Sequence, residues 1–333
     1  MSDFVKQQQT VCDFSSSDSW VILSPIEQSI KRKIEAVGTP LKDWDINIYR
    51  GVLTGCNEAF IISTEKRNEI LANCETEEER TRTSELIRPI LRGRDIKRYG
   101  YDWANLYLIA TFPACHYNIE DYPAVKNYLL SFAEQNLRDS GNNWIADSYL
   151  EDYCKQKLAQ TGKFIEITGK RVYIGNTAEK ARKRTSNKWF ETQDSISYWE
   201  DFYKPKIIYP NMTKYMPFVY DNDRYVTNQK CFIITGKHVS FLTAFLNSSL
   251  FKYCFRDSFP ELQGGTREMS KIFFDKIPVL KVVDEFDAEF EVLVNDIQRK
   301  YTKEKAITID NKIFDLYKLN DNERIEIGYV EIN

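Results

Sequence analysis

Helix-type and strand-type hydrophobic patterns follow one another along this chain in no regular order. Val239, Leu242 and Leu246 recur at helical spacing. Ile46 and Ile48 instead alternate with polar residues, as in a half-buried strand. Because the strand-like segments do not alternate regularly with helices, the order argues against repeated βαβ units and predicts an α+β fold.

The expected elements follow from these patterns and from capping residues. Ser24, Pro25 and Glu27 form a capping-box start for a helix that ends before Gly38. Further helices are expected at 65–79, 84–90, 123–138, 239–253 and 284–305, with Asp310 capping a last one that ends near 319. Strands are expected at 45–50, 59–63, 106–111, 206–209 and 231–235, with a hairpin at 163–168 and 171–174.

The composition excludes several classes of protein. With 42% hydrophobic and 29% charged residues, the 333-residue chain is neither disordered nor collagen-like. No apolar run reaches the ~18–20 residues of a membrane span, and the first residues lack a signal-peptide pattern. Seven cysteines without a Cys-x-x-Cys pair favour a reducing compartment. We therefore expect a cytoplasmic protein.

Charge is distributed unevenly along the chain. Residues 151–283 hold 22 Lys and Arg against 14 Asp and Glu, whereas residues 284–333 hold 7 against 13. A second basic stretch spans residues 80–99. A polyanionic partner would meet these basic segments rather than the acidic end of the chain.

No catalytic motif is present in the sequence. Phosphate-binding glycine loops, a Gly-x-Ser-x-Gly elbow and a His-Glu-x-x-His pair are all missing. His116 and His238 are the only histidines, too few for a His-rich metal site. We expect no catalytic residue, no metal site and no cofactor in this chain.

Three segments carry cations beside turn residues. In the first, Gly51 and Gly55 bracket a turn where backbone amides could approach an anion, with Arg50, Thr54 and Asn57 as donors. The second contains Arg92, Arg94, Lys97 and Arg98; its plain alternative is a surface loop in which Asp95 is tied to an arginine. In the third, Lys204 and Lys206 enter a strand. A flexible loop at 263–267 precedes the segment 273–278.

The combination and order of these segments resemble a known family. The segments are 38–41, 49–60, 89–96 (Pro-Ile-Leu-Arg-Gly-Arg-Asp-Ile), 122–126, 204–207, 246–248 and 277–278. Together they resemble the Taq I-like C-terminal specificity domain of adenine-N6 DNA methyltransferases, which also occurs in type IIG restriction–modification enzymes. The resemblance covers roughly residues 20–320, and 140–200 match poorly.

The resemblance implies a target recognition domain with a variable mixed sheet followed by helices. It implies a lead-in and linker helix at 1–37, the recognition domain at 38–280 with a variable insertion at 140–200, and a helical segment at 281–333. It also implies that the chain is a fragment. The methyltransferase core, with its S-adenosylmethionine pocket and Asn/Asp-Pro-Pro-aromatic tetrapeptide, would precede it in the full-length enzyme, which would also use Mg²⁺ if a nuclease is present.

Double-stranded DNA is thus the expected partner, together with the methyltransferase core. The expected DNA contacts are Arg50, Thr54, Asn57, Arg92, Arg94, Lys97, Arg98, Lys170, Arg171, Lys183, Arg184, Lys204 and Lys206. Among them, Arg92, Lys97, Arg98, Lys204 and Lys206 are expected on phosphates. The hairpin at 163–174 is expected to read bases.

Three other interpretations remain open. A small nuclease could work from scattered carboxylates, although its motif is missing. A type I-like specificity subunit would usually carry two recognition regions, whereas this sequence shows one. A protein–protein adaptor could use the basic segments for solubility alone. The amphipathic helix at 284–305 would either cap the core or space the recognition region from the rest of the enzyme.

Overall fold

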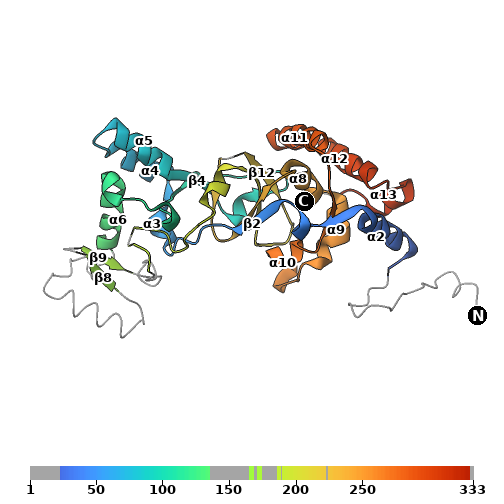
Figure 1. Cartoon of the computed structure of the whole chain (residues 1–333), viewed down its shortest axis with the longest axis horizontal. Helices are drawn as coiled ribbons and strands as arrows, with labels where there is room; N and C mark the ends of the chain where they lie inside the picture. The colour runs from blue at the N-terminus through green and yellow to red at the C-terminus, as the bar shows by residue number, and fades with distance from the viewer. Residues whose placement is uncertain are drawn as a thin grey trace, which may run out of the picture.

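The computed structural model describes residues 23–135, 165–168, 171–174, 186–188, 190–222 and 224–330. These residues form an elongated molecule (Figure 1). One end carries α4 (Thr64–Ala72), α5 (Glu77–Leu86) and α6 (Pro123–Gln135), the other end carries the C-terminal helices, and a sheet lies between them. Within the described residues, no helix has the length and apolarity needed to span a bilayer.

The remaining helices and the strands mix along the chain, as expected of an α+β fold. The helices are α2 (Pro25–Val37), α3 (Asn57–Phe60), α8 (Val239–Asn247), α9 (Ser249–Phe255), α10 (Lys271–Phe274), α11 (Asp284–Arg299), α12 (Lys303–Leu316) and α13 (Asp321–Ile327). The strands are β1 (Gly38–Pro40), β2 (Ile46–Arg50), β3 (Ile61–Ser63), β4 (Ile87–Leu91), β5 (Ile96–Lys97), β6 (Gly100–Tyr101), β7 (Leu106–Ile109), β8 (Ile165–Thr168), β9 (Arg171–Ile174), β10 (Pro205–Pro210), β11 (Met212–Thr213), β12 (Val219–Asn222), β13 (Val226–Thr227), β14 (Cys231–Gly236), β15 (Arg267–Glu268) and β16 (Pro278–Leu280).

The central sheet is buried on both faces. Its strands are antiparallel in the order β12-β10-β14-β2. Ile207 pairs with Ile234, and both point into one hydrophobic core; Ile208 pairs with Ile233, and both point into a second core. Because successive side chains of a strand face opposite sides, the same two strands build both cores.

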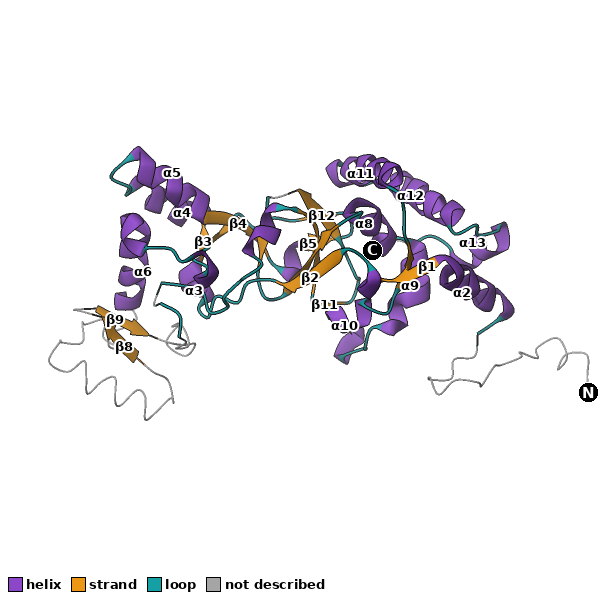
Figure 2. Cartoon of the chain, viewed as in Figure 1, coloured by secondary structure: helices purple, strands orange, loops and turns teal. Residues whose placement is uncertain are grey.

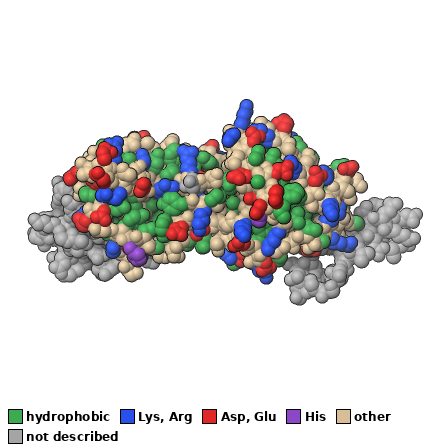
Figure 3. All heavy atoms as spheres, turned by 45° about the horizontal axis from the view of Figure 1, so that its top comes forward, with side chains coloured by type: hydrophobic (Ala, Val, Ile, Leu, Met, Phe, Trp, Pro, Cys, Tyr) green, Lys and Arg blue, Asp and Glu red, His purple; other side chains and the backbone are tan. Residues whose placement is uncertain are grey.

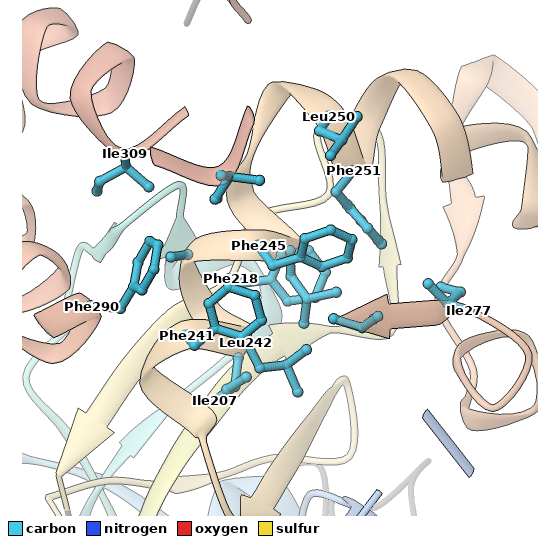
Figure 4. Close-up of a cluster of buried hydrophobic side chains, with 14 of the residues drawn as sticks. Ile207, Phe218, Phe241, Leu242, Phe245, Leu250, Phe251, Ile277, Phe290 and Ile309 are labelled. Carbon is cyan, nitrogen blue, oxygen red and sulfur yellow. The ribbon is translucent and has the colours of Figure 1, made fainter. Parts of the chain in front are cut away.

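The first core lies between the sheet and the C-terminal helices. Figure 4 shows Phe241 and Phe245 of α8 packed among apolar side chains from the sheet and from neighbouring helices. The ring of Phe241 meets that of Phe290 of α11 edge-on, with centroids 5.1 Å apart. The acidic C-terminal helices therefore cap the core with their apolar stripe, one of the two roles expected for this segment.

The second core lies under a smaller mixed sheet. Its strands run in the order β13-β4-β7-β3, with β13 parallel to β4 and the other pairs antiparallel. Val125 and Leu129 of α6 join this core on their apolar face. The pairing of β13 with β4 brings residues 226–227 beside residues 90–91, although they are far apart in sequence. The loops that follow these two strands therefore lie close together.

Several local predictions are confirmed. Ser24 and Glu27 make the reciprocal capping box, with Glu27 N–H donating to Ser24 Oγ over 3.3 Å and Ser24 N–H donating to Glu27 Oε2 over 2.6 Å. The strands at β2, β7, β10 and β14 are present, and β8 pairs with β9 as the expected hairpin, Thr168 opposite Arg171. Gly169 and Lys170, the expected turn, lie outside the described residues.

Other predictions are wrong at element boundaries. The expected helix at 84–90 is instead the end of α5 followed by β4, because β4 pairs with both β7 and β13. The start of the expected strand at 59–63 forms the short helix α3. The segment 65–79 divides into α4 and α5 at Asn73.

The helix expected at 239–253 breaks at Ser248, whose extended backbone lets its Oγ accept from the Phe251 N–H over 3.1 Å and begin α9. The helix expected at 284–305 ends at Arg299. Asp310 does not cap a short helix: it lies inside α12, buried, where it accepts hydrogen bonds from the backbone and hydroxyl of Ser249.

Candidate nucleic-acid interface

The turn between β13 and β14, residues 228–230, brings together segments from distant parts of the chain. Val52 N–H donates to Thr227 O over 2.7 Å. Asn228 N–H donates to Leu91 O over 3.2 Å, and Asn211 N–H donates to Lys230 O over 2.8 Å. Backbone hydrogen bonds therefore hold the segments around 50, 92 and 210 against a single turn.

Gly51 is needed for this close approach. A Cβ atom there would lie 2.1 Å from the backbone oxygen of Asn228, a separation that no side chain tolerates. The N–H of Gly51 donates to Cys231 O over 2.9 Å. The glycine therefore serves backbone packing, and its amide does not point to an anion as the sequence predicted.

Three exposed cations surround the turn. Arg50 is exposed, and its Nε donates to Gln229 O over 3.1 Å while its own carbonyl accepts from the Tyr198 hydroxyl. Arg94 lies in the 3-10 turn Gly93–Asp95, which packs against β10. Lys230 is exposed at the turn itself. We call Arg50, Arg94 and Lys230 the cationic turn surface.

The charged groups of Arg94 and Lys230 are available to bind a ligand. Among the described residues, no side chain or backbone group forms a hydrogen bond or ion pair with either of their side chains. The sequence reasoning missed Lys230. The signal that could have found it is its polar turn sequence, Asn-Gln-Lys, between two short apolar strands.

Thr54 and Asn57 are placed differently from each other. Thr54 is buried, and its hydroxyl donates to Asn57 Oδ1 over 2.8 Å. Asn57 is exposed at the start of α3. Because burial removes Thr54 from contact with a ligand, its role is to orient Asn57.

Two other expected contacts in the same basic segment, Arg92 and Lys97, have partners within the protein. Arg92 donates to both carboxylate oxygens of Asp95, over 3.0 and 2.8 Å. The alternative in which Asp95 is tied to an arginine is thereby confirmed. Lys97 lies 3.6 Å from Asp102, with both side chains exposed. Exposed ion pairs of this kind exchange readily with solvent and leave such a lysine able to meet a phosphate.

Lys206 is removed from the candidate set by burial. Its ammonium is fully buried, 2.6 Å from the Asp221 carboxylate, and donates to Phe202 O over 2.8 Å. Lys204, two positions earlier, is exposed and lies 3.2 Å from Asp201. The expectation of a phosphate contact at Lys206 is therefore wrong: the side chain pairs inside the protein because β10 is an inner strand of a sheet covered on both faces.

Arg98 is likewise a structural residue. Its side chain is buried, and it donates to the carbonyls of Asn247 and Val330 over 3.0 and 3.3 Å and lies 3.9 Å from Asp310. Burial, together with the neighbouring charge of Arg98, lowers the pKa of Lys252 to about 7. Arg98 therefore connects the basic loop to α8, α12 and the end of the described chain, and it cannot reach DNA from this position.

The remaining expected contacts cannot be located. Lys170, Lys183 and Arg184 lie outside the described residues. Arg171 begins β9, and only its backbone pairing is described. Within the described part of the chain, no group of three or more His, Cys, Asp or Glu side chains could hold a metal ion.

The surface carries charges of both signs. On the face shown in Figure 3, Lys and Arg side chains are interspersed with Asp and Glu, and the molecule narrows between its two ends. A ligand attracted by positive charge would therefore depend on local groups of cations, such as the cationic turn surface, more than on the field of the whole molecule.

Comparison with known proteins confirms the resemblance within one part of the chain. Residues 161–279 match the family model described as the TaqI-like C-terminal specificity domain. The match begins inside the segment 140–200, which the sequence resemblance had set aside as variable. It supports a DNA-recognition role in restriction–modification. No curated protein matches the chain.

The solved structures similar to the chain include two restriction enzymes. The type IIG restriction endonuclease BpuSI has 11% sequence identity and a TM-score of 0.49, over 89% of this chain and 34% of that chain. The type IIL restriction–modification enzyme MmeI in complex with DNA has 9% identity and a TM-score of 0.44, over 86% and 35%. This chain thus spans about a third of the length of either structure.

Proposed function

We propose that this chain binds double-stranded DNA sequence-specifically, as the target recognition region of a restriction–modification enzyme. The observation that carries the proposal is the convergence of Arg50, Arg94 and Lys230 on one turn, although they are far apart in sequence. Their charges are exposed, and those of Arg94 and Lys230 have no partner among the described residues. The family match of residues 161–279 includes the turn and Lys230.

In this proposal the cationic turn surface holds phosphates. An arginine can donate two parallel hydrogen bonds to one phosphate, and a lysine acts as a compact point charge. Lys97 and Lys204, both exposed, add contacts when their ion pairs with Asp102 and Asp201 open. Such contacts set the position of the duplex without reading its sequence.

The catalytic partner is part of the same proposal. We infer that the full-length enzyme carries an adenine-N6-specific methyltransferase core on the same polypeptide, and that it is of type IIG, with a nuclease as well. In this enzyme, residues 38–280 would form the recognition domain and residues 281–333 its helical segment. S-adenosylmethionine and Mg²⁺ would bind to that core and nuclease. While a base is rotated out of the stack into such a core, the recognition region would hold the flanking duplex.

Binding to a duplex at several salt concentrations tests the function. Replacing Arg50, Arg94 and Lys230 together by alanine should weaken binding and reduce the slope of log affinity against log salt by about 2.7, since each phosphate contact contributes about 0.9. The matched control replaces Lys31, Lys305 and Lys312, which lie on α2 and α12 away from the turn.

The control variant should keep the slope of the wild-type protein. Heparin is included as a competitor in a gel-shift assay, because it separates duplex recognition from simple attraction to a polyanion. Equal slopes for the wild-type protein and the Arg50/Arg94/Lys230 variant would remove this surface from the proposal. Failure of the wild-type chain to bind any duplex would overturn the proposed function and favour the adaptor interpretation.

A further inference from the structure

A two-stranded ribbon lies next to the cationic turn surface. β11 pairs antiparallel with β15, Met212 opposite Glu268 and Thr213 opposite Arg267, and the pair belongs to neither of the larger sheets. Figure 2 shows β11 below the central sheet and close to α10. The ribbon contributes little to the two hydrophobic cores, since only Met269, just after β15, is among the core residues.

The ribbon has a rigid base. The guanidinium of Arg267 is buried, donates to Phe259 O over 2.8 Å, and lies 2.8 Å from both Asp257 and Glu261. Glu261 also forms a backbone bridge with Arg267, and Leu262 N–H donates to Thr266 O over 2.6 Å. The loop between them is therefore closed at its neck and held by a charged network.

The tip of this loop is open to solvent. Gly264 and Gly265 have φ values of +76° and +77°, a left-handed conformation that glycine adopts without strain. A Cβ atom on Gly264 would meet nothing within 4 Å, and one on Gly265 would meet only Lys214 Cε, at 3.9 Å. The backbone of the tip can thus approach a ligand closely.

The side chains on the ribbon and in the loops that adjoin it are unusually exposed for their type. Met212 of β11 is 48% exposed, Tyr215 after β11 is 66% exposed, and Leu262 before β15 is 38% exposed. Gln263 and Lys214 are exposed beside them. An exposed group of aromatic and apolar side chains, rimmed by an amide and a cation, is typical of an interaction site.

The ribbon and the cationic turn surface are continuous. Asn211, directly before β11, donates its N–H to Lys230 O over 2.8 Å and accepts from Met269 N–H over 2.7 Å. A Cβ atom on Gly93, beside Arg94, would lie 3.5 Å from Pro210 Cβ. A ligand held by Arg94 and Lys230 would therefore meet the ribbon next.

We propose that this ribbon enters the major groove and reads base edges, with Gln263, Lys214 and Tyr215 as the residues that determine specificity. The inference rests on the proposed function. The major groove, about 12 Å wide, admits a two-stranded ribbon. A glutamine amide can donate to and accept from adenine at once, a lysine can donate to guanine, and an aromatic ring can contact the thymine methyl group. The neighbouring cations select DNA as the occupant, because they would hold phosphates beside the groove that the ribbon enters.

Selection from a random duplex library tests the inference. The wild-type chain and a Tyr215→Ala/Gln263→Ala variant are each incubated with the library, and the bound duplexes are sequenced. The variant should lose base preference at one or two adjacent positions, with the ratio of preferred to other bases falling about tenfold or more, while its affinity for bulk duplex stays near that of the wild-type protein. The matched control is Ile272→Ala, on α10 and 63% exposed, which should leave the base preference unchanged.

The outcomes separate the inference from the function on which it rests. If the wild-type chain selects a sequence and the ribbon variant selects the same one with equal stringency, the ribbon inference is overturned and DNA binding stands. If the wild-type chain binds duplexes without base preference, the ribbon inference fails, and so does the sequence-specific part of the proposed function, while DNA binding itself stands. If the wild-type chain binds no duplex, the proposed function itself fails.

Discussion

Lys204 and Lys206 are two positions apart in sequence, yet their surroundings are opposite. Lys204 is 55% exposed beside Asp201, whereas Lys206 is fully buried against Asp221, which also accepts from Tyr225 N–H over 3.0 Å. From the sequence alone, both residues are cations at the start of a predicted strand. The difference arises because β10 is an inner strand of a sheet covered on both faces, so that a residue inside it has no route to solvent.

Alanine at these two positions should therefore have different effects on stability. Lys206→Ala leaves the Asp221 carboxylate buried without its cation, and we expect a loss of about 3–5 kcal/mol in the free energy of unfolding. Lys204→Ala removes an exposed cation, and Asp201 keeps the hydrogen bond from the Thr235 hydroxyl, so the cost should be about 0–1 kcal/mol. Urea denaturation of both variants measures this, and similar losses for the two would contradict the burial of Lys206.

At the scale of elements, short-range signals predicted helix starts better than helix ends. The capping box at Ser24 and Glu27 is local, since both partners lie within one turn, and it is present as expected. The break at Ser248 was missed because α8 and α9 both carry apolar residues at helical spacing. It is decided by Asp310 of α12, which accepts from Ser249 N–H over 2.8 Å.

The capping box offers a test at this scale. Ser24→Ala removes the acceptor for the Glu27 N–H and should lower the free energy of unfolding by about 1 kcal/mol. Ser24→Asp supplies another acceptor and should stay close to the wild-type protein. Urea denaturation followed by circular dichroism compares the three, and an unchanged stability in the alanine variant would contradict the predicted contribution of the cap.

For the whole molecule, the two cores are joined through shared strands. Ile233 and Ile234 are neighbours in β14, but each lies in a different core. Because β10 and β14 take part in both, loss of either core removes packing from the strands on which the other depends. The described part of the chain should therefore unfold in a single transition.

Paired substitutions on one strand test this cooperativity. Ile233→Val and Ile234→Val should each lower the free energy of unfolding by about 0.5–1.5 kcal/mol. Each should move the denaturation midpoint by the same amount whether it is followed by tryptophan fluorescence or by circular dichroism. Midpoints that separate between the two probes in either variant would show that the cores unfold independently.

The sequence by itself determined the local features: the capping box at Ser24, the period-two strand at Ile46–Arg50, the hairpin of β8 and β9, and the fold class. It also determined the family resemblance, through the order of its motifs. These depend on neighbours within a few residues or on patterns along the chain.

Tertiary structure decided which cations face solvent. Lys206 and Arg98 pair with carboxylates elsewhere in the chain, and Lys230 joins Arg50 and Arg94 because β14 pairs with β2 and β13 pairs with β4. The ribbon of β11 and β15 likewise forms from segments about fifty residues apart. Whether a charge is exposed or buried depends on strand pairing over long separations, and no periodicity within a short window carries that information.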